Sequence, residues 1–418
     1  MNQPTPAELE EGRVRAPGVA EFVAIVAAMI AVTALSIDIM LPALPEIGQA
    51  FGLEDENSRQ LVITCYILGF ALGQVVYGPL SDSYGRKPLL LAGLALFAVG
   101  SVATLAAGDF TALLLARAAQ GFGGGAPRVI AVAIVRDLYG GRRMARIMSF
   151  AMMVFVIVPI VAPSVGQGLM ELGEWRWVFA FLLLFCVVLM AVTLRLPETR
   201  PRGTRSPFSL AWLAGAVREI LADRLAVGYT VATGFVFGCL MAYVNTAQQV
   251  FAGVFQLGDA FPLVFGSIAI AVALASLLNA RLVERVGMRL LSHAALAGHF
   301  LSAAANLALA LLLAATPPLA VYCLLVALNL FCFGFIMPNF NALAMEPLQR
   351  IAGTASSFIG CVTTGAGAVL GWVVGQQFDG TVVPLLAGFT LMSAAALVVI
   401  VFTERGRLFA ASPQDGHA

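Results

Sequence analysis

Two long uncharged stretches on either side of a short charged turn constrain the fold of this chain more than any other feature. Residues 60–81 and 88–108 contain no Asp, Glu, Lys or Arg. About 20 apolar residues suffice for a helix to cross a bilayer, and each stretch is long enough. The turn between them contains Asp82, Arg86 and Lys87. The pattern therefore predicts two membrane helices joined by a tight polar loop.

Composition extends this prediction to the whole chain. Of the 418 residues, 60% are hydrophobic and 11% are charged, whereas soluble domains contain about 25% charged residues. A soluble fold of this length cannot hide so much apolar surface, so lipid must surround it. Charge-free windows and Pro or Gly breaks predict twelve spans. The predicted fold class is an all-α membrane protein with twelve transmembrane helices in two six-helix bundles.

A segment rich in proline and arginine separates the first six spans from the last six. It contains Pro197, Pro201 and Pro207 together with several arginines, which is typical of a linker. The predicted organisation is an N-tail at 1–19, an N-terminal six-helix bundle at 20–195, the linker at 196–222, a C-terminal six-helix bundle at 223–403 and a C-tail at 404–418.

The distribution of basic residues predicts the orientation. Twenty of the 24 Arg and Lys residues lie in the two tails or in the loops after even-numbered spans. Cytoplasmic loops of membrane proteins carry such an excess of positive charge. We therefore expect both termini and the linker to lie in the cytoplasm.

The two halves also repeat a charge pattern. Residues 82–87 contain an acid, a glycine and a final base, and residues 284–289 contain the same three at the same spacing, 202 residues later. Many secondary carriers are built from such a parallel repeat, with the substrate site near the midplane between the halves. The repeat favours a carrier over a channel.

Several other classes of function find no support in the sequence. The net charge of +1 does not indicate a nucleic-acid partner, and the six cysteines, none in a CxxC pair, predict neither disulfides nor a metal site. No HExxH, P-loop or GxSxG pattern is present, so we expect neither an enzyme nor a cofactor. The lipid bilayer is an expected partner, and we expect a monomer.

Several motifs resemble those of the major facilitator superfamily. Residues 78–87, GPLSDSYGRK, resemble the loop after the second helix in that family, Gly-x-x-x-Asp-x-x-Gly-Arg-Lys. Ser83, Ala162 and Gln167 depart from the family pattern. Segments that resemble the twelve-spanning drug:proton antiporters and their Bcr/CflA branch are LSIDIMLPALP at 35–45, RAAQG at 117–121, PIVAPSVG at 159–166, WRWVF at 175–179, AGTASS at 352–357 and GTVVPL at 380–385.

The resemblance implies a proton-coupled efflux transporter of the bacterial inner membrane, an antiporter that exports small amphipathic drugs or antibiotics by alternating access. The many Phe (28) and Met (14) residues favour a loosely selective apolar cavity. The alternative is a proton-coupled metabolite or sugar transporter of the same fold. Such an uptake carrier usually has more hydrogen-bonding residues in its core helices.

Asp38 is the only acid deep in an apolar span of the first half. Charge in hydrocarbon is costly, so acids at such positions usually face a cavity and take part in function. The alternative is a helix-end carboxylate in the outer headgroup zone, because Pro42 ends the span. Arg117 lies roughly 10 Å inside the fourth span and can pair with Asp38 in proton and substrate coupling. The alternative for Arg117 is a structural cation bound to backbone carbonyls.

The loop around Asp82 is interpreted as a gate. A helix N-terminus attracts a carboxylate, so Asp82 is expected near the start of the eleventh span at Gly353. Such contacts, together with a possible Arg86–Asp137 pair, would hold one side closed in one state and break in the other. The alternative is that the basic residues only fix topology. The gating residues are Gly78, Asp82, Gly85, Arg86, Lys87 and Asp137.

Proline, glycine and isolated polar residues mark further positions inside the spans. Pro159, Pro163 and Gly166 are expected to bend the fifth span, the antiporter helix. Glycines four residues apart in the second span (69, 73) and eleventh span (367, 371, 375) predict close packing, and in this fold these two helices meet between the halves. The cavity candidates, each with a structural role as the alternative, are Tyr66, Arg128, Asn245, Gln248, Asn339 and Asn341.

Overall fold

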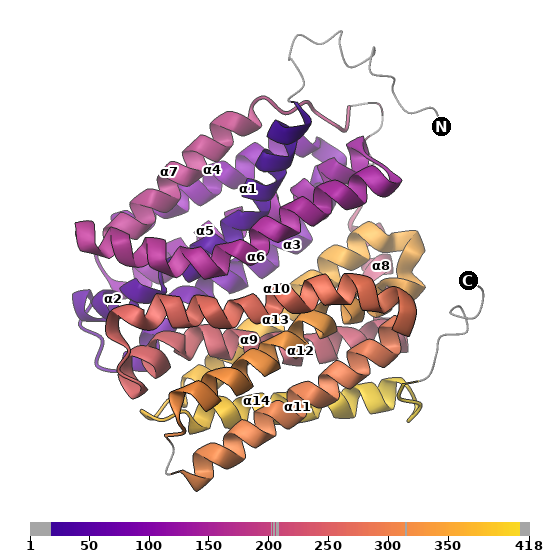
Figure 1. Ribbon diagram of the computed structural model, residues 1–418. Helices are drawn as coiled ribbons and strands as arrows, with labels where there is room; N and C mark the ends of the chain where they lie inside the picture. Colours follow the sequence, from indigo (N-terminus) through magenta and orange to yellow (C-terminus); the bar gives the residue numbers. More distant parts are fainter. Residues whose placement is uncertain (1–17, 202, 204, 206–208, 314–315, 410–418) are drawn as a thin grey trace.

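The computed structural model describes residues 18–201, 203, 205, 209–313 and 316–409, and every regular element within them is a helix (Figure 1). Most of the predicted N-tail and C-tail, and residues 202, 204 and 206–208 of the predicted linker, among them Pro207, lie outside the described residues. The helices are α1 Val19–Asp38, α2 Leu44–Ala50, α3 Leu61–Tyr84, α4 Arg86–Leu105, α5 Phe110–Leu138, α6 Gly141–Leu172, α7 Arg176–Thr193, α8 Leu210–Ala222, α9 Arg224–Gln248, α10 Phe261–Val286, α11 Met288–Leu312, α12 Leu319–Met345, α13 Ala352–Gly375 and α14 Val383–Thr403.

The helix lengths fit a membrane-embedded all-α fold. Twelve of the described helices contain 18 or more residues. Ten segments among the described residues are long and apolar enough to cross a membrane. One of these, Leu319–Gly375, contains both α12 and α13, and the shorter apolar stretch Ile157–Leu172 of α6 is not among the ten. The membrane fold is as predicted, while the count of twelve crossings stays a prediction.

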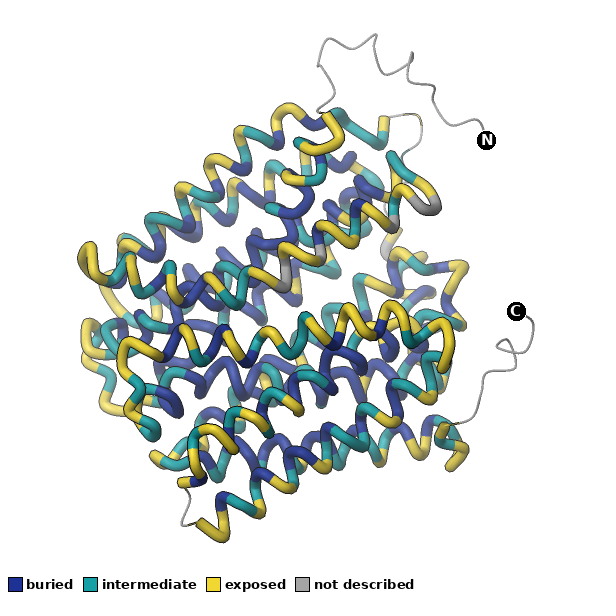
Figure 2. Tube along the Cα trace, in the orientation of Figure 1, coloured by how far each residue is buried: buried dark blue, intermediate teal, exposed yellow. Residues whose placement is uncertain are grey.

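The long helices form two groups that lie against each other. In Figure 1, α1 and α3–α7 occupy the upper part and α9–α14 the lower part. The groups meet where α3 packs on α13 and where α6 packs on α10. Buried residues concentrate inside the groups and along their contact, while the outward faces of the peripheral helices are exposed (Figure 2). We call the groups the first and the second bundle.

Glycine spacing sets the distance between helices inside each bundle. Gly69 and Gly73 of α3 lie against the backbone of α5, and Gly367 and Gly371 of α13 lie against α9. A Cβ at any of the four would collide with its neighbour. The expectation that these glycines pack α3 on α13 is therefore wrong for all but Gly375, which faces the other bundle.

The segment predicted as a linker contains a helix of its own. Ser209 caps α8, because its hydroxyl accepts a hydrogen bond from the backbone N–H of Trp212 at 3.2 Å. Ala216 and Ile220 of α8 are buried in the core of the second bundle. The second half of this segment therefore belongs structurally to the second bundle.

Helix α3 defines two ends of the molecule. Gln60 precedes its first residue and Asp82 lies in its last turn. Asp82 lies 22 positions after Gln60, which corresponds to about 33 Å at 1.5 Å per residue, close to the thickness of the hydrocarbon core of a bilayer. We refer to the Gln60 end and the Asp82 end.

Candidate functional site

Asp38 is the last residue of α1, and it is buried with 5% exposure. Its carboxylate neither accepts a hydrogen bond from nor pairs with any residue that the structure describes. It interacts electrostatically with Tyr243 of α9, which places it at the contact between the bundles. Burial argues against the headgroup alternative. A charged carboxylate without a partner is costly in such surroundings, so Asp38 is a candidate proton-binding group.

Arg117 of α5 is fully buried and does not pair with Asp38. Its Nε donates to the carbonyl oxygen of Val62 at 3.1 Å, and its Nη2 donates to that of Ser36 at 3.1 Å. Its Nη1 donates to Gln120, and its guanidinium lies 4.4 Å from the centre of the Tyr66 ring. The predicted pair is therefore not formed among the described residues. The contacts match the alternative, a structural cation that ties α5 to α1 and α3.

The antiporter helix α6 passes directly beside the end of α1. Gly166 lies against the backbone carbonyl of Ile39, and a Cβ there would collide with the carbonyl oxygen. Pro159 and Pro163 lie two turns and one turn before Gly166 inside α6. The structure thus brings Gly166 next to the residue that follows Asp38.

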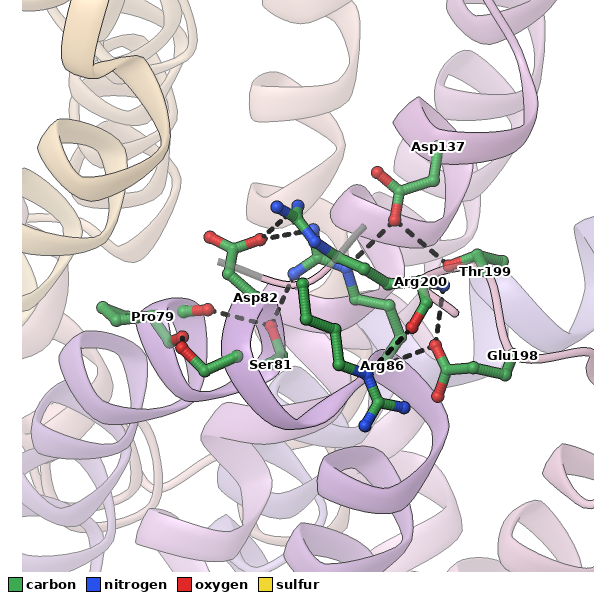
Figure 3. Close-up of polar contacts among 11 residues, drawn as sticks. Pro79, Ser81, Asp82, Arg86, Asp137, Glu198, Thr199 and Arg200 are labelled. Carbon is green, nitrogen blue, oxygen red and sulfur yellow. Dashed lines mark hydrogen bonds and ion pairs between the residues drawn. The ribbon is translucent and has the colours of Figure 1, made fainter. Parts of the chain in front are cut away.

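A cluster of charged side chains lies at the Asp82 end (Figure 3). Arg86, with a side chain 2% exposed, forms ion pairs with Asp82 at 2.6 Å and with Asp137 at 3.0 Å. Its Nη1 also donates to the hydroxyl of Ser81 at 2.6 Å. The predicted Arg86–Asp137 pair is confirmed. One buried guanidinium therefore joins the end of α3, the start of α4 and the end of α5.

Two residues after α7 complete this cluster. The Glu198 carboxylate accepts hydrogen bonds from the backbone N–H groups of Arg86 and Lys87 at 3.0 and 3.2 Å. It thereby satisfies free N–H groups at the start of α4, where the helix dipole favours negative charge. Arg200 pairs with Asp82 at 2.8 Å. We call Asp82, Arg86, Asp137, Glu198 and Arg200 the charge cluster.

The placement of Asp82 differs from the sequence expectation. Asp82 contacts two guanidinium groups of the charge cluster rather than the N-terminus of α13. The loop approaches α13 instead through Gly78, where a Cβ would collide with the hydroxyl of Ser357. Both arginines contact Oδ1 of Asp82, and such charge-assisted hydrogen bonds are stronger than those between neutral groups.

Gly85 has a backbone conformation that other residues adopt rarely. Its φ is +105°, and it separates α3 from α4. A Cβ there would lie 2.6 Å from the Glu198 carboxylate and 2.7 Å from Arg205. Both the turn and the close approach of the segment after α7 therefore require glycine.

The six cavity candidates separate into different environments. Tyr66 is buried under Arg117, and Asn339 donates to Asn279 of α10 at 2.7 Å, which indicates structural roles. Asn341 is exposed and Arg128 is half-buried. Asn245 and Gln248 of α9 each have a side-chain oxygen that is buried and without a hydrogen-bond partner among the described residues.

The second bundle repeats the charge cluster with different residues. Arg289, the final base of the repeated pattern, pairs with Glu346 at 3.3 Å and with Glu404 at 3.2 Å. Glu346 lies directly after α12, and Asp137 lies at the end of α5, which has the equivalent place in the first bundle. Glu404 lies directly after α14, and Glu198 lies shortly after the equivalent helix α7. The ion pairs of the two bundles therefore join similarly placed elements. The pairing arginine is the final base of the repeated pattern in the second bundle, but the residue before the final base, Arg86, in the first.

Sequence reasoning missed Glu198 and Arg200 as members of the cluster. A signal was present, because an acid and a base follow closely after the sixth apolar stretch. It also missed Tyr243, which is uncharged and sits in an apolar stretch without any distinguishing pattern.

Comparison with known proteins gives consistent matches over nearly the whole chain. The family model described as Major Facilitator Superfamily matches residues 26–372. A bicyclomycin resistance protein homolog of Haemophilus influenzae is 32% identical over 371 residues, which cover 88% of this chain and 91% of that protein. The multidrug resistance protein MdtL of Shewanella oneidensis is 29% identical over 379 residues, with 87% and 90% covered.

Among solved structures, the xylose transporter XylE from E. coli, in a partially occluded inward-open conformation, matches with a TM-score of 0.71 at 12% identity. The match covers 92% of this chain and 97% of that protein. At this identity the likeness concerns the fold alone.

Proposed function

Because the chain belongs to the Major Facilitator Superfamily, we propose that it exports small amphipathic drugs or antibiotics in exchange for protons. Members of the family are transporters of small molecules and not enzymes. The observation that carries the proposal is the likeness, over nearly the whole chain, to proteins named for bicyclomycin and multidrug resistance. The fold shared with a xylose transporter adds no specific support for the alternative, sugar or metabolite uptake.

Asp38 is the proposed proton carrier. It is buried at the contact between the bundles and has no described partner that would hold it permanently charged. A carboxylate whose surroundings alternate between apolar and hydrated can bind a proton on one side and release it on the other. Arg117 acts as a positioning residue, because its bond to the Ser36 carbonyl holds the end of α1 two residues before Asp38.

Proton exchange can supply the required driving force. One elementary charge moving through 100 mV yields about 2.3 kcal/mol. Since about 1.4 kcal/mol corresponds to a factor of ten, one-for-one exchange with a neutral drug would sustain a gradient of roughly fifty-fold. A pH difference across the membrane would increase this value.

The charge cluster is the proposed gate on the cytoplasmic side. Its members come from α3, α4, α5 and the segment after α7. That segment leads into α8, which packs on the second bundle. Movement of one bundle against the other would therefore pull on Glu198 and Arg200 and strain their bonds to the loop.

Asn245 and Gln248 are the cavity candidates with the strongest support. A buried polar atom without a partner costs about 1–3 kcal/mol, so their free oxygens would gain from a bound substrate or water. Asn245 lies in the last turn of α9 and Gln248 is its last residue, four and one residues before Gln249, and Tyr243 lies on the same helix. Donor groups on a drug would hydrogen-bond to these oxygens.

The topology and assembly belong to the same proposal. The excess of basic residues at the Asp82 end supports a cytoplasmic location for that end and for both termini. The bacterial relatives support the inner membrane as the location. We propose a monomer that binds no nucleic acid.

Drug export can be tested in a bacterial strain that lacks its own multidrug pumps. Cells that express the protein should tolerate a higher concentration of at least one compound in a panel of amphipathic antibiotics, and they should lose this tolerance with a protonophore. Asp38→Asn should abolish the tolerance, whereas Glu54→Gln, a change at an exposed acid, should not. If no compound in a broad panel distinguishes expressing cells from empty cells, drug export is refuted.

A further inference from the structure

Four amide side chains join the two bundles at the Gln60 end. Asn57 and Gln60 belong to the first bundle, and Gln249 and Gln376 belong to the second. Gln60 is fully buried and Gln249 is 4% exposed. We call these four residues the amide cluster.

The amide cluster forms a continuous set of hydrogen bonds between the bundles. Gln60 Nε2 donates to Gln249 Oε1 at 2.7 Å and to the carbonyl oxygen of Gly375 at 3.1 Å. Gln249 Nε2 donates to Asn57 Oδ1 at 2.7 Å. Asn57 Nδ2 donates to the carbonyl oxygen of Phe378 at 2.9 Å, closing the set.

Gln376 adds a further hydrogen bond across the contact. Its Nε2 donates to the backbone carbonyl of Asn57 at 2.9 Å. Gly375 makes this approach possible, because a Cβ there would collide with the amide of Gln60. The bonds connect positions up to 321 residues apart in the chain, so they exist only while the bundles touch at this end.

The amide cluster differs from the charge cluster in one physical respect: none of its members carries a charge. No charged residue occurs in the stretch 225–258 around Gln249. On the α13 side the first charge is Asp379, which accepts from Thr381. The nearby charges on the first bundle are the exposed Glu54 and three residues after it. The Asp55 carboxylate accepts a hydrogen bond from the backbone N–H of Asn57 at 2.9 Å, and Glu56 and Arg59 pair at 3.3 Å.

From this arrangement we propose that the amide cluster is an uncharged gate, which must open whenever the transporter exposes its site at the Gln60 end. The inference rests on the proposed transport by alternating access, in which the bundles part at one end at a time. Neutral amides do not titrate in the range of the coupling proton, and salt screens only charges. The hydrogen bonds of the amide cluster therefore have the same strength whether or not the coupling proton is bound. We expect pH to change other steps of the transport cycle.

Spin labels can measure opening at this end without any substrate. Glu54 and Gln377 are exposed and lie on opposite bundles next to the amide cluster. Neither side chain forms a hydrogen bond or ion pair with the residues that the structure describes. Cysteines at these two positions, in a variant without the native cysteines, would report the distance between the bundles by double electron–electron resonance. Because no drug is needed, this test can fail or succeed independently of the drug-export proposal.

Gln60→Leu should shift the ratio of separated to closed distances by about tenfold towards separation, equivalent to about 1.4 kcal/mol. The matched control is Gln49→Leu, which removes an exposed amide of α2 at the same end and should leave the ratio unchanged. Gly375→Ala, whose added Cβ would collide with the amide of Gln60, should shift the ratio in the same direction and replaces Gln60→Leu if that variant does not fold.

Gln60→Glu tests the neutrality of the gate, with Asp38→Asn present so that the coupling group cannot titrate. With Gln60 intact, the ratio should not change between pH 5 and pH 8. With Glu at this position, a charged carboxylate would face the oxygens of Gln249 and Gly375 at pH 8. The repulsion between these oxygens should open the gate, and protonation of the carboxylate at pH 5 should close it again. If Gln60→Leu behaves like Gln49→Leu, or the ratio with Gln60 intact changes with pH, the uncharged gate is refuted.

Discussion

Replacing Arg86 by Met tests the charge cluster most sharply. The variant keeps an apolar stem but removes the guanidinium, and Met288 occupies the corresponding position in the second half. Removing one partner of a buried ion pair costs about 3–5 kcal/mol. Here the side chains of Asp82 and Asp137 are 36% and 18% exposed, and Asp82 keeps Arg200 as a partner. We therefore expect the free energy of unfolding to fall by a smaller amount, about 2–3 kcal/mol.

Equilibrium unfolding in mixed micelles gives this quantity, and a double-mutant cycle isolates the pair. The double variant Arg86→Met with Asp137→Asn should lose about 1–2 kcal/mol less free energy of unfolding than the sum of the losses in the two single variants. Arg136→Met, at an exposed arginine in the last turn of α5, is the matched control and should have little effect. If Arg86→Met unfolds like this control, or if the two single effects simply add, the ion pairs do not stabilise this end and the reasoning fails.

Two further substitutions follow from local geometry. Gly85→Ala should reduce efflux per molecule of inserted protein, because φ is +105° and the new Cβ would lie 2.6 Å from the Glu198 carboxylate; a normal efflux rate would contradict the role of this turn. Arg117→Lys should lower the melting temperature in detergent, since one ammonium group cannot reproduce the planar set of bonds to the carbonyls of Val62 and Ser36. An unchanged melting temperature would show that these bonds contribute nothing.

The sequence was sufficient for the fold because the membrane imposes strong rules on it. Uncharged stretches of bilayer length, broken by charged turns, can only be helices. The same reasoning found the Arg86–Asp137 pair, because both residues lie in turns on the same predicted side of the membrane. Local patterns of charge and length were enough for these features.

Features that depend on the rotation of helices about their axes could not be predicted in this way. The depth of Arg117 suggested a pair with Asp38, but its side chain points to the carbonyls of Val62 and Ser36 instead. Depth along a helix follows from residue number, whereas direction follows from packing. The amide cluster was invisible for a related reason, because amides at the ends of distant spans, such as Gln60 and Gln249, share no local signal.

Proton-driven export through Asp38 is the central claim, and transport in reconstituted vesicles tests it most directly. Vesicles that contain the protein and a drug identified in the cell assay should concentrate that drug against its gradient when a pH step is imposed. Asp38→Asn should bind the drug with similar affinity but fail to concentrate it, whereas Glu54→Gln should behave like the unchanged protein. If Asp38→Asn still concentrates the drug in response to the pH step, the proton is carried by another group and the account is contradicted.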